Sequence, residues 1–196
     1  MEQVKPDLLQ LVADFVNTVD LERGDDELAT AAGLGRWLRT HGLWGGRPTA
    51  ADASFAREAR EAIRELLRAN NDCAAERAQA TEVLDAVARR AGITVRFVDD
   101  SIRLVSPAGG VGAVVAAAGQ AMADGSWLRL KACRADSCRW AFVDGTRNGS
   151  RLWCSMQTCG NREKARAFRL RQKRESSSSG DRSASDSSTR SASSSP

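Results

Sequence analysis

The sequence predicts an α+β protein: a mainly helical N-terminal domain with a small β-hairpin or sheet, followed by a small four-cysteine module that ends in a basic helix. Three observations predict it. Apolar residues recur at helical spacing in the first part of the chain, they alternate over residues 94–105, and four cysteines form two close pairs. The predicted boundaries are 1–128 for the first domain, 129–174 for the cysteine module and 175–196 for a tail.

Four helices are predicted before residue 92 from apolar residues that recur every three or four positions. Asp7 and Thr49 are suitable N-caps for the first and third of these helices, and Gly92 is a suitable stop for the fourth. Glu and Arg alternate along the third helix at i,i+3 and i,i+4 spacing, which predicts an exposed face. The predicted ranges are about 8–19, 28–41, 49–68 and 75–91.

The pattern then changes from helical spacing to alternation. Residues 94–98 and 102–105 are rich in Val, Ile and Phe and flank the turn Asp99-Asp100-Ser101. This arrangement predicts a β-hairpin. A further helix is predicted over Gly112–Asp124, with Gly125 as its stop.

The cysteines have the spacing of a metal site. Cys133 and Cys138 are separated by four residues, as are Cys154 and Cys159, and a short loop joins the two pairs. Such a loop can return the second pair to face the first, so that four thiolates surround one Zn²⁺ at ~2.3 Å and leave no open position. We therefore predict a structural zinc site. Two disulfides or an iron–sulfur cluster are the alternatives, and a reducing compartment disfavours the disulfides.

The charge of the chain is divided unequally. Residues 1–128 hold 14 basic and 19 acidic residues, whereas residues 129–174 hold 13 basic and 3 acidic residues. A basic segment joined to a mildly acidic domain indicates a polyanionic partner, most often nucleic acid. The alternative is a solvated basic surface without a partner.

The basic residues after the last cysteine are predicted to share one helix face. Asn161 is a suitable N-cap. Counted from Arg162 as i, the residues at i, i+4, i+7 and i+11 are all basic. Such a helix can cross phosphates or enter a groove. In the loop between the cysteine pairs, Arg147 and Asn148 can also contact phosphate, although they can equally serve the turn alone. The candidate nucleic-acid contacts are Arg147, Asn148, Asn161, Arg162, Arg166, Arg169 and Lys173.

The sequence predicts a cytoplasmic protein with no membrane contact, associated with the nucleoid if it binds DNA. It opens with no signal peptide, and its apolar runs fall short of the ~18 residues that a membrane helix needs.

Residues 176–196 contain 12 serines and few apolar side chains. Such a segment cannot bury enough surface to offset its ordering entropy, so we predict that the tail is disordered.

Two segments resemble known families. Trp153-Cys-Ser-Met156, two further residues and Cys159-Gly-Asn-Arg162 resemble the signature of the CGNR zinc-finger family. The upstream residues Trp140-x-Phe142-x-Asp144 and Arg147-Asn-Gly149 agree with it, whereas Thr146 and Leu152 stand where Ser and a basic residue are common. The resemblance implies that the four cysteines bind zinc, that Gly160, Asn161 and Arg162 complete the motif, and that the module binds DNA.

The N-terminal part is similar to the ABATE domain, which precedes this finger in stress-induced transcription regulators. The similarity rests on Asp14-Phe-Val-Asn-Thr18 and on the helix that contains Arg60 and Arg64. In a DNA-binding regulator, this domain would sense a small-molecule ligand or form a homodimer.

Two functions follow from these observations. The first is a DNA-binding transcription regulator whose finger contacts DNA. The second is a zinc-stabilised RNA-binding or protein-interaction module, in which Trp140 or Trp153 would be exposed. An enzyme is not expected, because no nucleophile motif or acid/base pair accompanies His41, the single histidine.

Overall fold

The computed structural model describes residues 8–43 and 46–182, and its elements confirm the predicted α+β class. The described chain divides between Cys154 and Ser155 into two compact units. The first unit contains the helices and strands of the N-terminal part together with three of the paired cysteines. The second contains Cys159 and the basic helix.

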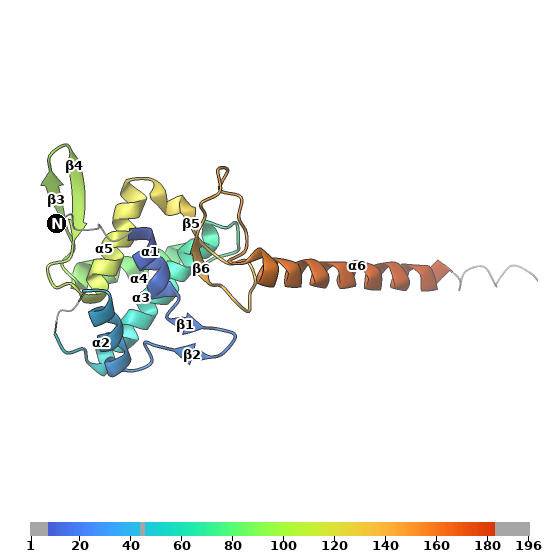
Figure 1. The fold of residues 1–196 in the computed structure, drawn as a ribbon, viewed down its shortest axis with the longest axis horizontal. Helices are drawn as coiled ribbons and strands as arrows, with labels where there is room; N and C mark the ends of the chain where they lie inside the picture. Colours follow the sequence, from blue (N-terminus) through green and yellow to red (C-terminus); the bar gives the residue numbers. More distant parts are fainter. Residues whose placement is uncertain (1–7, 44–45, 183–196) are drawn as a thin grey trace, which may run out of the picture. The chain divides into compact units, whose positions relative to one another are not determined.

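The described part of the first unit contains five α-helices, and α3 packs against each of the other four (Figure 1). Apolar side chains of α1, α3 and α5 fill the core between them, with Phe15, Ile63 and Val114 fully buried. The helices are α1 (Leu8–Val16), α2 (Ala31–Thr40), α3 (Ala50–Ala69), α4 (Arg77–Arg90) and α5 (Gly110–Ala123).

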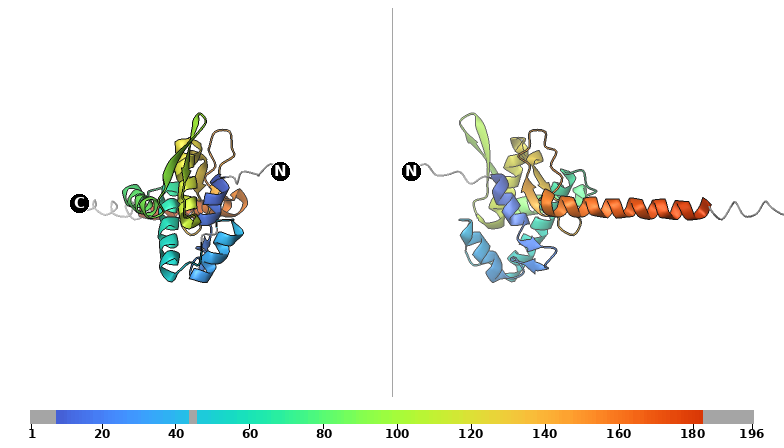
Figure 2. Two further views of the ribbon diagram at one scale, coloured as in Figure 1. Left: turned by 90° about the vertical axis from the view of Figure 1, so that its left-hand side faces the viewer. Right: turned by 45° about the vertical axis from the view of Figure 1, so that its right-hand side comes forward.

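The strands form three separate antiparallel pairs. The predicted hairpin is confirmed: β3 (Thr94–Val98) pairs with β4 (Ser101–Val105), and Asp99 adopts the left-handed backbone of the turn, with φ 48°. Both views in Figure 2 show this hairpin standing out from the helices. The other two pairs were not predicted, since their strands are only two or three residues long: β1 (Val19–Asp20) with β2 (Asp25–Asp26), and β5 (Leu130–Ala132) with β6 (Ala141–Val143). A 3₁₀ turn, η1 (Ser126–Arg129), precedes β5.

Local signals set the helix ends. At Thr49 a capping box forms: its hydroxyl accepts from the Asp52 N–H at 3.2 Å, and the Asp52 carboxylate accepts from the Thr49 N–H at 2.9 Å. The first helix ends at Val16, earlier than predicted. The side chain of Asn17 instead pairs with the backbone of Ala141 in β6, and Val19 enters β1.

The prediction of an exposed Glu/Arg face on α3 is wrong for two of its arginines. Arg60 and Arg64 are only 4% and 1% exposed. Arg60 makes a bidentate pair with Asp26, at 2.6 and 2.9 Å. Burial is tolerated because each guanidinium group finds acceptors inside the fold.

Arg64 joins three parts of the first unit. Its guanidinium donates to the carbonyl of Val16 at the end of α1, to the carbonyl of Arg139 in the cysteine-bearing segment, and to the carboxylate of Glu61, at 2.7, 3.2 and 3.0 Å. The central helix is therefore bonded directly to both the N-terminal segment and the segment that carries the cysteines.

The second unit begins with a π-helical turn, η2 (Met156–Gly160), which continues into α6 (Asn161–Arg182). The prediction that Asn161 caps the helix is wrong. Ser155 is the cap, since its hydroxyl accepts from the Thr158 N–H at 3.2 Å. Asn161 already has helical backbone angles, and its side chain donates to the carbonyl of Gln157.

Helix α6 also extends into the segment predicted to be a disordered tail. It runs to Arg182, because adding residues to a formed helix avoids the cost of nucleation. Residues 183–196 of that tail lie outside the described residues.

Within the described ranges, no helix combines the length and the apolar character that a membrane crossing requires.

We predict that Arg64→Met lowers the free energy of unfolding by about 2–4 kcal/mol, because the buried carbonyl of Val16 and the partly buried carbonyl of Arg139 lose their donor. Thermal or urea unfolding of the purified protein measures the change. Arg89→Met, on the exposed face of α4, is the matched control and should stay within about 0.5 kcal/mol of the parent. Equal effects of the two substitutions would contradict the role given to Arg64.

Candidate metal centre

The structure brings the two predicted cysteine pairs to one point. The sulfur atoms of Cys133, Cys138, Cys154 and Cys159 all lie within 4.8 Å of one another. None of the four is in a disulfide, and Cys133 and Cys159 are buried. Cys73, the fifth cysteine, lies outside this group.

A tight turn forms the first half of the centre. Arg139, directly after Cys138, adopts a left-handed backbone with φ 50°. The N–H group of the next residue, Trp140, then donates to the sulfur of Cys138. Two further backbone N–H groups, those of Ala135 and Cys154, donate to the sulfur of Cys133. Such donors stabilise thiolates, which are the form of cysteine that binds metals.

The sulfur spacing suits a tetrahedral metal ion. Cys138 and Cys154 have their sulfurs 3.6 Å apart, which is too long for a disulfide. A tetrahedral ion with metal–sulfur bonds of ~2.3 Å would place its sulfurs about 3.8 Å apart. The residues present therefore fit a four-thiolate metal ion.

Without a cation these sulfurs cannot all be charged. A hydrogen bond from Cys138 lowers the pKa of Cys133 to about 5. The same bond, followed by burial, raises the pKa of Cys138 far above its ordinary value. The first shift favours the thiolate of Cys133 and the second the thiol of Cys138, whereas a bound divalent ion would favour thiolates at both.

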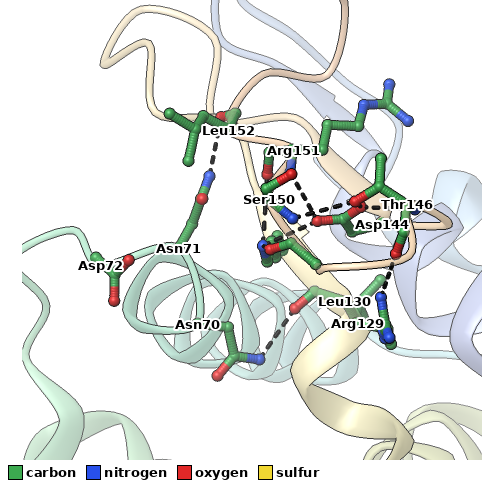
Figure 3. A network of polar contacts seen from close by, with 12 residues as sticks. Asn70, Asn71, Asp72, Arg129, Leu130, Asp144, Thr146, Ser150, Arg151 and Leu152 are labelled. Atoms are coloured by element: carbon green, nitrogen blue, oxygen red, sulfur yellow. Dashed lines mark hydrogen bonds and ion pairs between the residues drawn. The ribbon is translucent and has the colours of Figure 1, made fainter.

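The C-terminal end of α3 holds both cysteine-bearing stretches in place (Figure 3). Asn71 donates to the carbonyls of Ala132 and Leu152, at 2.8 and 2.9 Å, and these residues precede Cys133 and Cys154 closely in sequence. Asn70 donates to the carbonyl of Leu130 at 2.9 Å. These two asparagines were not predicted as site residues, although an Asn pair directly after a helix was a visible signal.

A buried ion pair organises the loop between the cysteine pairs. The side chains of Lys131 and Asp144 are 7% and 0% exposed, and their charged atoms are 2.9 Å apart. Asp144 also accepts from the N–H and hydroxyl of Thr146 and from the N–H of Arg151, and Figure 3 shows these bonds converging on its carboxylate. Burial alone would raise the pKa of Asp144, but the bonds from Thr146, Lys131 and Arg151 hold it well below its ordinary range.

The candidate nucleic-acid contacts lie on the surface of their own units. Arg147 and Asn148 are exposed in the loop that Asp144 organises. The other candidates are exposed on α6 or at its start: Asn161, Arg162, Arg166, Arg169 and Lys173.

Comparison with protein families finds two matches. A CGNR zinc finger matches residues 129–172. The ABATE family, described as "putative stress-induced transcription regulator", matches residues 9–125, which is more than half of the chain. A search of curated proteins finds no match.

We predict that Asp144→Asn lowers the free energy of unfolding by about 3 kcal/mol at neutral pH, because the ammonium group of Lys131 stays buried without its counter-charge. The lowered pKa makes this contribution fully present above the ordinary carboxyl pKa, so the difference from the parent should narrow as the pH falls below it. Urea unfolding across pH measures both effects.

The control for this prediction is Asp136→Asn. That carboxylate is 74% exposed and contributes only surface ion pairs, so a loss below about 1 kcal/mol is expected. A loss at Asp144 as small as that at Asp136 would contradict the structural role of the buried pair.

Proposed function

Because the chain belongs to the ABATE family and carries a CGNR zinc finger, we propose that it is a DNA-binding transcription regulator. In this proposal one zinc ion binds Cys133, Cys138, Cys154 and Cys159, and thereby fixes the start of α6. The observation that carries the proposal is the row of exposed basic side chains on α6, which follows directly from the turn that contains Cys159.

Zinc is the metal that the ligand set favours. Four thiolates in a closed tetrahedral site are typical of structural zinc, whereas Mg²⁺ and Ca²⁺ prefer oxygen ligands. Zinc supplies no chemistry of its own here, since four protein ligands leave no position for water or substrate. Neither matched family is named for an enzymatic activity.

The basic side chains support phosphate contact. Arg162, Arg166 and Arg169 recur at the spacing of one helix face, and all three are exposed. A helix of this kind can follow the DNA backbone or enter the major groove. We propose that Arg147 and Asn148 provide a second contact, that the N-terminal domain senses a ligand or forms the homodimer, and that the protein acts at the nucleoid.

One observation favours the alternative of an RNA-binding or protein-interaction module. Trp140 is 37% exposed, and Phe168 on α6 is 54% exposed. Exposed aromatic rings can stack on unpaired bases or pack against a protein partner. Single-stranded RNA therefore belongs beside duplex DNA in the binding experiments.

We predict that the zinc-loaded protein binds duplex DNA with a logarithmic salt slope of about −0.9 for each phosphate neutralised. The double variant Arg166→Gln/Arg169→Gln should bind more weakly, and its slope should be smaller by about 0.9 for each phosphate that is no longer neutralised. Fluorescence anisotropy across salt concentrations measures both quantities.

Arg36→Gln/Arg89→Gln removes the same charge from exposed positions on α2 and α4 and is the matched control. It should leave the slope unchanged. Lack of duplex binding at low salt, or stronger binding to single-stranded RNA, would contradict the proposed function.

A second prediction concerns the metal. Cys154→Ser should lose stoichiometric zinc, melt at a lower temperature and lose DNA binding, because apparent zinc binding energies of ~10–16 kcal/mol stabilise such modules. Cys73→Ser should leave all three properties unchanged. Metal analysis, melting curves and anisotropy on both variants check this, and a Cys154→Ser protein with full zinc content and the parent melting curve would count against the ligand assignment.

A further inference from the structure

A cavity of about 570 Å³ lies in the first unit between α1, the C-terminal end of α2 and β6. Successive turns of α1 present Gln10 and Asp14 to it, and Asn17 follows directly after the helix. His41 follows α2, and Trp140 lies directly before β6. Cys154 also lines the cavity, so a molecule bound there would touch the segment that carries the metal ligands.

Each amide side chain of this cavity has one N–H group engaged by the protein. Asn17 donates to the carbonyl of Ala141 at 2.9 Å and accepts from the N–H of the same residue at 2.7 Å. Gln10 donates to Asp14 at 2.7 Å. Each amide keeps a second N–H group, and Asp14 adds acceptor capacity through its carboxylate, whose side chain is 41% exposed.

The one arginine of the lining is also committed to internal contacts. Arg151 donates through Nε to the carbonyl of Trp153 at 2.9 Å and through Nη2 to the carbonyl of Cys154. Its guanidinium group lies 4.6 Å from the centre of the Phe142 ring. These contacts hold the positive charge of Arg151 against two backbone carbonyls and the Phe142 ring.

In its neutral form His41 contributes a second acceptor. Its Nδ1 is 2.9 Å from the carbonyl oxygen of Trp37, and since a carbonyl only accepts, Nδ1 carries the proton. The ring is held by stacking on Trp37, with centroids 4.0 Å apart. In the neutral ring Nε2 is then an acceptor, 3.7 Å from a carboxylate oxygen of Asp14. Two acceptors that face each other are satisfied together by a donor placed between them.

The remaining lining also favours a cation. Glu27 adds a second exposed carboxylate. Trp140 adds an aromatic ring that is partly exposed at the cavity, and aromatic faces attract cations. An anion would meet two carboxylates, and an apolar ligand would bury Asp14 without replacing the water that solvates it.

We propose that this cavity binds a small organic cation with a primary ammonium group. The ammonium N–H groups donate to Asp14 and to Nε2 of His41, and the carbon skeleton lies against Trp140. This inference concerns the first unit alone and does not depend on DNA binding by α6.

Isothermal titration calorimetry of the zinc-loaded, full-length protein tests the inference. The probes are butylamine and phenethylamine, with butanol and phenethyl alcohol as neutral analogues of the same shape. Saturable binding of the amines without binding of the alcohols is expected. The indole N–H resonance of Trp140, identified by its loss in Trp140→Phe, should shift on addition of phenethylamine.

Asp14→Asn keeps the shape of the side chain and should weaken amine binding by about tenfold or more. Asp85→Asn removes the same charge from the exposed face of α4 and should leave binding unchanged. His41→Phe keeps a ring against Trp37 but removes Nε2, so it serves if Asp14→Asn does not fold. Absence of saturable amine binding, equal binding of the alcohols, or equal losses of affinity in the Asp14 and Asp85 variants would overturn the inference.

Discussion

Four sulfur atoms gathered within 4.8 Å of one another impose the constraint on which the C-terminal half of this protein depends. As thiolates they repel each other, and as thiols they make weak hydrogen bonds, so the cluster needs a positive charge at its centre. In the pair of Cys133 and Cys138, the pKa of Cys133 is lowered and that of Cys138 is raised, so the two sulfurs are not both charged at neutral pH. A divalent ion bound by all four, as we propose, would offset the repulsion between thiolates.

Side chains on or after α3 hold the cysteine-bearing segment of the first unit in place. Arg64, Asn70 and Asn71, all on or directly after α3, donate to backbone carbonyls of the cysteine-bearing segment. Three of the four cysteines consequently belong to the same compact unit as the helices, although the two family matches meet between residues 125 and 129. The boundary between the two family matches therefore does not coincide with the boundary between the two compact units.

Features that depend on residues close together in the sequence could be predicted from the sequence. The capping box at Thr49, the turn at Asp99 and the cysteine spacing each need only neighbouring residues. The short strands could not be predicted, because β6 is held by contacts such as that of Asn17 with Ala141, which lie 124 positions apart. Alternating charges on α3 gave the wrong face for Arg60 and Arg64 for the same reason: their acceptors are distant in sequence. The cavity beside Cys154 likewise arises from three separate segments.

The measurement that tests this account most directly is X-ray absorption at the zinc edge on the purified, reduced protein. Coordination by all four cysteines predicts a first shell of four sulfur atoms at ~2.3 Å, with no nitrogen or oxygen scatterer. A protein that carries no zinc, or a shell that contains oxygen or nitrogen in place of one or more sulfurs, would contradict the four-thiolate centre and the role given to the helix that follows it.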